Sequence, residues 1–487
     1  MPEQIEKKKK RGIMRRIFKW IWLALLTALI LGALIFDAPW KVLALLLILL
    51  AAHTILPKGT VKWFWLSVAA VVVILIIWVF LPENNEGWRP YTFDKEFVAL
   101  QAKYAIPGSE NAAIPYNKLF ESLDIDANQP KFFAKSRDEP WRSGDHPETA
   151  EWLKGHQQTI DTLLEISRIE KCQFPITSNT AERPERLNKM RRCAFLLISS
   201  ANNDIAEGRI DASLKKYLAI PGIGKHLYQQ PAIIDFLVGI ALESLPLTHL
   251  NRFIIEGEPT DQQLQLIANF LPDLKNNWNS DFDKVLTYEK LLQKNMLSFF
   301  YEINQQGKVR LSRDPTAVFK MWFPQQTPPT LSYFCRKRAK AGTLLGWFFM
   351  PPIPQKAGKI FDECYEKYDV MTKPDFDWGK IPDEVRPQFK LNYRFLIESL
   401  VNISAASYYR IHEVYIRSLT YRRGSRLLVA IRQYKNENGN WPPDLDAIKS
   451  IAPAEAFIDP VGGKQFEYEN HGKRFSLYGE TTNIWPK

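Results

Sequence analysis

Three apolar runs near the N-terminus decide how this chain is organised: IFKWIWLALLTALILGALIF at 17–36, APWKVLALLLILLAAHTIL at 38–56 and WFWLSVAAVVVILIIWVFL at 63–81. A helix needs roughly 20 apolar residues to cross about 30 Å of hydrocarbon, and the first and third runs meet that length. The second run is a weaker candidate for a membrane-spanning helix, because a proline and a lysine lie near its start and a histidine near its end. Tryptophans at the ends of the runs favour spanning helices, since indole rings prefer the headgroup level. The sequence therefore predicts a membrane block of three helices over 17–81.

The basic residues set the expected orientation of this block. Seven lysines and arginines lie in the tail 1–16, and such an excess marks the cytoplasmic side. The connection Asp37–Lys41 is short, so the first two runs form a helical hairpin if both span the bilayer. The third run then carries the chain out, which predicts a multi-pass protein of the cell (inner) membrane with 82–487 on the extracytoplasmic side. If the second run only lies in the interface, that domain is cytoplasmic instead.

The formal net charge of +11 is concentrated in the same region. Through Lys62 the chain has 11 basic and 3 acidic side chains, a surplus of 8, which leaves only 3 for all remaining residues. The positive charge is therefore a topology signal and a source of attraction to anionic lipid. A phosphate-binding groove would need the cations in the folded domain, so no nucleic-acid partner is expected.

The 487-residue chain becomes polar after the membrane block, and apolar periodicity of the helical kind dominates it. We expect a mainly α protein with a helical domain at 82–303, a proline-rich irregular and helical segment at 304–386, and a C-terminal module at 387–487. The expected helices of the first domain cover 93–104, 111–123, 145–168, 184–207, 211–228, 230–250, 260–270 and 278–301. The helix at 230–250 is the most apolar and should lie at the centre of the core.

One helix pair in this domain resembles a tetratricopeptide unit. Its junction has a glycine turn at Gly208, a small residue at Ser213 and an aromatic at Tyr217. A small residue lets two helices approach, and an aromatic ring fills the gap above it. The sequence has one such copy, and a repeat solenoid needs about three, so no solenoid is predicted. The resemblance implies a helix-hairpin architecture and a protein-binding surface.

The C-terminal module should join a long helix to a small sheet. The helix covers 387–434, either as one element or as two broken near Gly424, and alternating residues at 464–469 and 474–480 predict a β-hairpin. The runs AIRQYKNENGNWPPDL, IDPVGGKQFEY and FSLYG, all within 430–479, resemble the C-terminal part of type II secretion major pseudopilins. That family ends in a calcium-binding loop, for which Asp459 and Glu480 are poor substitutes. Together with the region 207–230, the pattern also looks like a group of large bacterial membrane proteins.

Four cysteines lie outside the membrane block: Cys172, Cys193, Cys335 and Cys364. An even number outside the cytoplasm permits two disulfides, and pairing of sequence neighbours, 172 with 193 and 335 with 364, is the simplest connectivity. The alternative is four buried thiols, because a domain of this size builds a core without disulfides. Their spacing does not match a zinc site.

Other residues invite chemical interpretations that the sequence does not favour. His146, Glu148, Glu151 and His156 could suggest a metal, but the histidines are ten residues apart and acids are common at a helix N-terminus. The acid pairs Glu148/Glu151 and Asp362/Glu363 fit no catalytic motif, so no catalytic residue, cofactor or metal is predicted. The segment 335–354 could contact a membrane interface or form an ordinary core helix.

These observations favour a non-enzymatic, membrane-anchored scaffold or protein-binding module of the bacterial cell envelope. Its partners would be the bilayer, through 17–81, and a protein, through the helical domain. The alternative is an envelope hydrolase or transferase acting on a cell-wall or lipid substrate, which would need paired carboxylates or an activated nucleophile.

Overall fold

The computed structural model describes residues 87–125, 128–178, 183–271, 278–311, 353–373, 397–398, 401 and 405–486. The predicted membrane block at 17–81 and the basic tail lie outside these residues. The described chain is mainly helical, as predicted, and it has two small antiparallel sheets. It divides into two compact units, and each unit combines stretches that are far apart in the sequence.

The first unit takes most of its described residues from 87–93, 292–311 and 353–370. It holds the strands β1 (Trp88–Pro90), β2 (Tyr301–Asn304) and β3 (Val309–Leu311), which form one antiparallel sheet in that order. The end of helix α12 (Trp278–Met296), the 3-10 helix η3 (Leu297–Phe300), helix α15 (Pro354–Tyr365) and most of η4 (Glu366–Thr372) complete it. The sequence did not predict this sheet, because β1 pairs with the distant strand β2, where Trp88 lies opposite Asn304.

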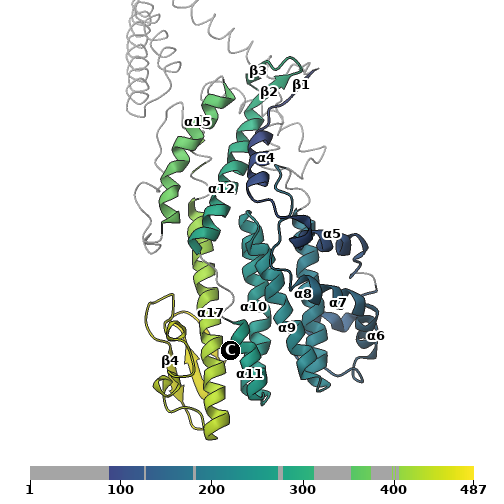
Figure 1. Cartoon of the computed structure of the whole chain (residues 1–487), viewed down its shortest axis with the longest axis vertical. Coiled ribbons are helices and arrows are strands. Elements are labelled where there is room, and N and C mark those ends of the chain that lie inside the picture. Colours follow the sequence, from purple (N-terminus) through teal and green to yellow (C-terminus); the bar gives the residue numbers. More distant parts are fainter. Residues whose placement is uncertain are drawn as a thin grey trace, which may run out of the picture. The chain divides into compact units, whose positions relative to one another are not determined.

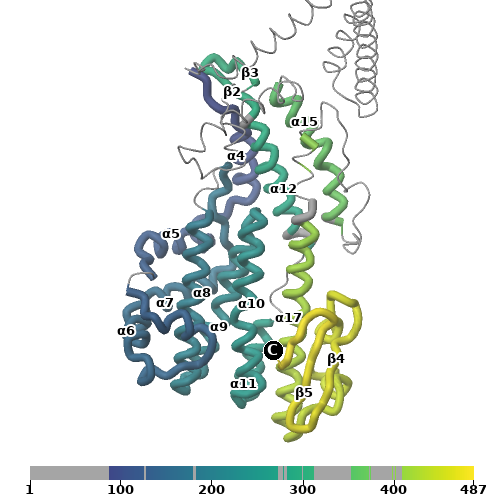
Figure 2. Tube along the Cα trace, turned by 180° about the vertical axis from the view of Figure 1, so that it is seen from behind, coloured from purple at the N-terminus to yellow at the C-terminus, as the bar shows by residue number. Residues whose placement is uncertain are grey.

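The second unit contains the remaining helices and the C-terminal sheet, drawn mainly from 94–291 and 406–486. Its elements before α12 are α4 (Asp94–Lys103), η1 (Gly108–Glu110), α5 (Ala113–Ser122), η2 (Lys131–Arg137), α6 (Pro147–Gly155), α7 (Gln157–Ile166), α8 (Arg183–Ala206), α9 (Ile210–Tyr228), α10 (Ile233–Glu256) and α11 (Asp261–Phe270). Helices α8, α9 and α10 run side by side in both views (Figures 1 and 2). Short turns join them, so neighbouring helices are antiparallel.

Helices α8 and α9 lie within one residue of the ranges predicted for them, whereas α10 continues six residues beyond its predicted end at 250. Gly208 lies in the turn that ends α8 and has a φ of +76°, a conformation that glycine adopts without strain. Thr260 caps α11, since its side chain accepts from the Gln263 amide while the Gln263 side chain accepts from the Thr260 amide. The prediction of one helix over 145–168 was wrong: α6 and α7 are separate and meet at His156.

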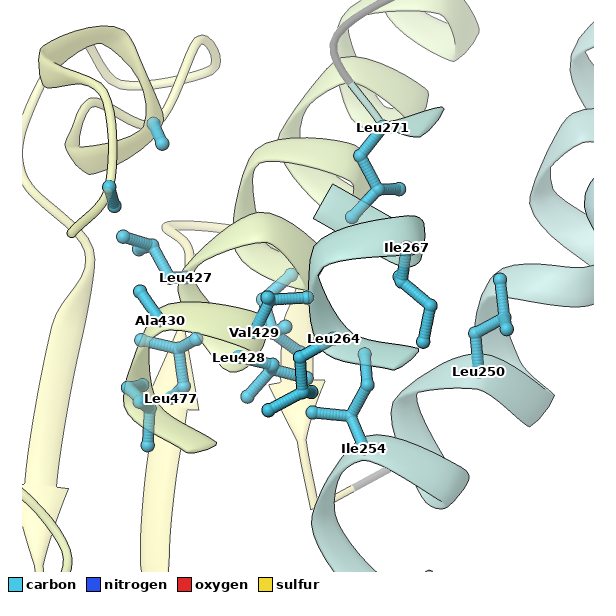
Figure 3. Close-up of a cluster of buried hydrophobic side chains, with 14 of the residues drawn as sticks. Leu250, Ile254, Leu264, Ile267, Leu271, Leu427, Leu428, Val429, Ala430 and Leu477 are labelled. Carbon is cyan, nitrogen blue, oxygen red and sulfur yellow. The ribbon is translucent and has the colours of Figure 1, made fainter. Parts of the chain in front are cut away.

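Two apolar clusters form the core of this unit. One lies among α5, α7, α8 and α9 and includes Tyr116, Ile160, Leu163 and Leu197, all of them fully buried. The other lies among α10, α11, the long helix α17 (Ala405–Asn438) and the C-terminal sheet, and Figure 3 shows part of it. In this second cluster, Ile254 of α10 lies beside Leu264 of α11. The predicted place of the most apolar helix in the core is therefore confirmed.

The C-terminal module packs against the second half of α17. Gly424 does not break this helix; a Cβ there would lie 2.6 Å from Ile484, so glycine makes room for that side chain. After the helix follow η5 (Leu445–Ile448), η6 (Ala454–Phe457), β4 (Glu467–Asn470), β5 (Phe475–Tyr478) and β6 (Asn483–Trp485). The predicted hairpin corresponds to β4 and β5, and β6 adds a third strand that was not predicted.

Asp459 and Trp441 hold this module in place. The Asp459 carboxylate is buried and accepts from the Thr420 hydroxyl at 2.6 Å and from the Glu480 amide at 2.7 Å. Trp441 is buried, donates from its indole nitrogen to the Lys473 carbonyl and has the Lys435 ammonium 4.0 Å from its ring centroid. The oxygens of Asp459 therefore serve the attachment of the sheet to α17.

Candidate functional site

One group of interacting titratable side chains lies where α8, α10 and α12 meet in the second unit. We call it the Asp235 cluster, and its members are Arg183, Arg186, Asp235, Lys284, Tyr288 and Glu289. Asp235 is in the first turn of α10 and only 1% exposed. Arg186 contacts its Oδ1 at 2.8 Å and Arg183 contacts its Oδ2 at 3.4 Å, both from the first turn of α8. One carboxylate thus joins the starts of two helices.

Glu289 and Tyr288 bring α12 into the same cluster. The Glu289 carboxylate accepts from the backbone amide of Ile233 at 3.0 Å, which satisfies one of the free N–H groups at the start of α10. The Tyr288 hydroxyl accepts from Arg183 and donates to the Thr177 carbonyl. Each contact crosses between elements that are distant in the sequence.

Lys284 and two glutamines close the cluster on the side of the loop 171–178. The Lys284 ammonium donates to Gln173 Oε1 at 3.0 Å and to the Gln229 carbonyl. Gln230 is buried; it accepts from the Phe174 amide at 3.0 Å and donates to the Cys172 carbonyl at 2.9 Å. These bonds fix the loop against the C-terminal end of α9 and the turn that leads into α10.

Burial controls the electrostatics of the two carboxylates. Desolvation raises the pKa of Asp235, and the neighbouring Arg186 and Arg183 oppose this effect without cancelling it. Desolvation also raises the pKa of Glu289 against the Ile233 amide and Arg183, and the negative charge of Asp235 adds to that rise. Asp235 is buried and Glu289 is half-buried, and both have raised pKa values. Acid–base catalysis uses such pairs of carboxyl groups, and ion-pair networks between helices also produce them.

A second buried ion pair links α10 to α17 in the same unit. Glu243 is fully buried, and its Oε1 lies 2.8 Å from the Nε of Arg422, which is itself buried. The Tyr228 hydroxyl donates to the other oxygen of Glu243, so three helices meet at one carboxylate. Burial raises the pKa of Glu243 in spite of the arginine.

The candidate residues considered in the sequence do not come together into a site. The His146 ring stacks on Phe132 with centroids 3.3 Å apart, and His156 Nδ1 lies 2.8 Å from the Trp152 carbonyl. Glu148 and Glu151 are exposed on α6. Within the described part of the chain, no group of three or more His, Cys, Asp or Glu residues could hold a metal ion.

The second acid pair lies on α15 in the first unit. Asp362 accepts from the Lys294 ammonium at 2.8 Å, which joins α15 to the end of α12. A Cβ at Gly358 would meet the Lys294 side chain at 3.0 Å, so glycine allows this lysine to lie across the helix. Asp362 therefore joins two helices by an ion pair, but its side chain is 37% exposed, unlike those of Asp235 and Glu243.

The disulfide that the sequence permits between Cys172 and Cys193 is not formed. Both side chains are buried free thiols in the α8 core region, and desolvation raises their pKa values, that of Cys193 to about 12. Protonated, inaccessible thiols are unreactive, which agrees with the alternative of buried cysteines. Cys364 is buried on α15, whereas its expected partner Cys335 lies outside the described residues, as does the segment 335–352.

Comparisons of the chain with protein-family models, with curated proteins and with solved structures find no match. Among the described helices, α10 is long and apolar enough to cross a membrane, and half of its most apolar stretch is buried inside the protein. Asp235 and Glu243 give α10 two buried acids, each paired with arginine from a neighbouring helix. Its apolar character is accounted for by its place in the core.

Proposed function

We propose that this protein is a multi-pass, membrane-anchored scaffold of the bacterial cell envelope that binds a protein partner through its helical domain. The membrane block at 17–81 anchors it, the N-terminus is cytoplasmic and the domain that follows is extracytoplasmic. The α17 helix with its small sheet supports the further proposal that the C-terminal module is pseudopilin-like. We make no proposal of polymerisation, because three apolar runs stand where that family has a single N-terminal helix.

The scaffold proposal is supported by the structural role of the buried carboxylates, which bind groups from neighbouring elements. Asp235, Glu243 and Asp459 are at most 2% exposed, and each binds groups from other elements of its unit. A carboxylate engaged in this way stabilises a fixed arrangement of helices. Its substitution is therefore expected to lower the stability of the fold and not to abolish a reaction. A rigid helical domain that leaves apolar side chains on its surface suits protein binding.

Photo-crosslinking in cells tests the proposed binding. A photoreactive amino acid replaces one exposed apolar residue at a time: Val98 on α4, Ile114 on α5 or Leu266 on α11, which are 69%, 54% and 45% exposed. We expect a discrete heavier adduct from at least one position after irradiation. The matched control replaces the exposed Glu139 in the same way and should give none. No adduct from any position, or adducts that equal the control, would contradict a protein partner.

The orientation of the domain gives a separate prediction. In a Cys335→Ser background, Glu139→Cys places one exposed thiol on the helical domain, since Cys172, Cys193 and Cys364 are buried. A membrane-impermeant maleimide should label it fully in intact spheroplasts. Labelling only after lysis would place the domain in the cytoplasm, as expected if the second apolar run does not span.

One observation favours the second candidate function, an envelope hydrolase or transferase: Asp235 and Glu289 are neighbouring carboxyl groups whose pKa values are both raised by burial. The Asp235→Asn substitution separates the two functions. If Asp235 is structural, its replacement leaves two arginines without their anion, and we expect a loss of about 2–4 kcal/mol in unfolding free energy.

The measurement is urea unfolding of the detergent-solubilised protein, with Asp161→Asn on the exposed face of α7 as the control. The control should change stability by less than about 0.5 kcal/mol. An unchanged stability in Asp235→Asn, with loss of hydrolysis of an envelope substrate, would favour the enzyme.

A further inference from the structure

The register of the first sheet places one end of it beside the entry of the chain. Trp88 pairs with Asn304 and Pro90 with Glu302, while Ile303 pairs with Val309. The turn between β2 and β3, at 305–308, therefore lies at the same end of the sheet as Trp88, the first residue of β1. We call this end, formed by 87–89 and 304–310, the Trp88 end.

The short segment between the third apolar run and β1 keeps the Trp88 end close to the membrane block. The third apolar run ends at Leu81, seven residues before Trp88. Fully extended residues span at most about 3.6 Å each, so Trp88 lies no more than roughly 25 Å from the end of that run. The headgroup region adds several ångströms to the hydrocarbon on each side. The Trp88 end is thus the part of the described chain with the shortest tether to the headgroups.

The accessible charges on the Trp88 end are positive. Arg89 and Lys308 are exposed, and Arg310 lies with its guanidinium 3.9 Å from the centroid of the Trp88 ring. The one acid in the strands of this sheet, Glu302, is 5% exposed and lies 2.8 Å from Arg310. The turn residues 304–306 are polar and uncharged. Anionic headgroups attract these exposed cations, while Glu83 and Glu86 in the tether 82–86 oppose that attraction, and tryptophan is enriched at headgroup depth.

We propose that the Trp88 end docks on the anionic headgroups of the leaflet from which the third apolar run emerges. This proposal rests on the proposed membrane anchoring. Docking holds the first unit at a fixed height above the bilayer instead of leaving it on a free linker. The cations Arg89 and Lys308 supply the attraction, while Trp88 and Arg310 form the interfacial contact.

Headgroup quenching in vesicles tests the docking. The full chain, as Cys335→Ser with Gln306→Cys in the β2–β3 turn, is labelled with a fluorophore and reconstituted into phosphatidylcholine vesicles with or without added phosphatidylglycerol. A nitroxide attached to the lipid headgroup is the quencher. We expect strong quenching in the anionic vesicles and weak quenching in the neutral ones. A label on Glu139→Cys, an exposed position outside the Trp88 end, serves as the comparison.

The charge variants sharpen the test. Each lysine or arginine near an anionic surface contributes an attraction equivalent to about a fivefold change in an equilibrium, so Arg89→Gln with Lys308→Gln should lower the ratio of docked to undocked protein roughly 25-fold. The control pair Lys131→Gln with Lys154→Gln removes the same charge from exposed sites in the second unit and should leave the quenching unchanged.

The outcomes separate the docking from the anchoring. The protein could float with the vesicles but show equal quenching in both lipid compositions, or quenching that Arg89→Gln with Lys308→Gln does not change. Either result overturns the docking and leaves the membrane anchoring intact. Protein that does not float with the vesicles at all overturns the anchoring on which the proposal rests.

Discussion

Replacement of Arg422 by methionine is expected to lower the free energy of unfolding by about 3–5 kcal/mol, because it leaves the Glu243 carboxylate buried without its cation. Glu243 is completely buried and Arg422 is 4% exposed, so water cannot take over the lost contact. The Tyr228 hydroxyl, which donates to the same carboxylate, is neutral and does not replace the charge. Urea unfolding of the purified chain followed by circular dichroism measures the loss.

A double replacement provides the matched control. Glu243→Leu with Arg422→Met removes both charges and keeps apolar volume at the contact between α10 and α17. Buried ion pairs replaced as a whole by apolar residues often leave stability unchanged or higher. The double variant should therefore recover most of the stability lost in Arg422→Met. A single variant as stable as the parent protein would show that the contact contributes nothing to the packing of α17.

The pH dependence of this effect has a definite sign. Burial raises the pKa of Glu243, so the folded protein holds this proton more tightly than the unfolded chain does. The stabilising contribution of that proton is greatest at low pH and is lost as the pH rises through the raised pKa. Without Arg422 the pKa of Glu243 rises further, so the stability gap between the single variant and the parent should widen as the pH rises above the ordinary range of a glutamate carboxyl.

The second large effect is expected at the crossing of α9 and α10. Gly224 and Gly239 face each other there, and a Cβ on either glycine would lie 2.9 Å from the carbonyl oxygen of the other. Gly239→Ala must push two helix backbones apart, since neither carbonyl can rotate away. We expect a loss of about 1–3 kcal/mol in unfolding free energy, the usual cost of overpacking.

Gly155→Ala on α6 is the matched control for this substitution. A Cβ at Gly155 meets nothing within 4 Å, so alanine gains helix propensity there without a clash. It should leave the protein equally stable or stabilise it by up to about 1 kcal/mol. Thermal unfolding of the two variants side by side tests the contact. Equal stability of Gly239→Ala and the parent would mean that α9 and α10 are not in backbone contact.

The hairpins of the helical domain could be predicted because their signals are local. The apolar spacing of Leu187, Met190, Ala194 and Leu197 gives α8 one buried face, and Gly208 supplies the positive φ that ends the helix. The break at His156 was missed because 145–168 has helical periodicity throughout. No single residue in it forbids a continuous helix.

The site and the first sheet could not be predicted because their partners are remote in the sequence. Arg183 and Arg186 look like ordinary surface residues of a helix start, and their partner Asp235 is 49 residues beyond Arg186. Trp88 lies before the first expected helix at 93–104, and its strand pairs with residues around Ile303. Only the folded chain shows which charges are buried together.

Membrane extraction of the full chain tests the central claim most directly. Cells that express it are lysed, and the membranes are washed with alkaline carbonate, which releases proteins held only by surface contacts. If 17–81 is an integral anchor, the protein stays in the membrane pellet and enters solution only with detergent. Recovery of the intact chain as a water-soluble monomer without detergent would contradict the account.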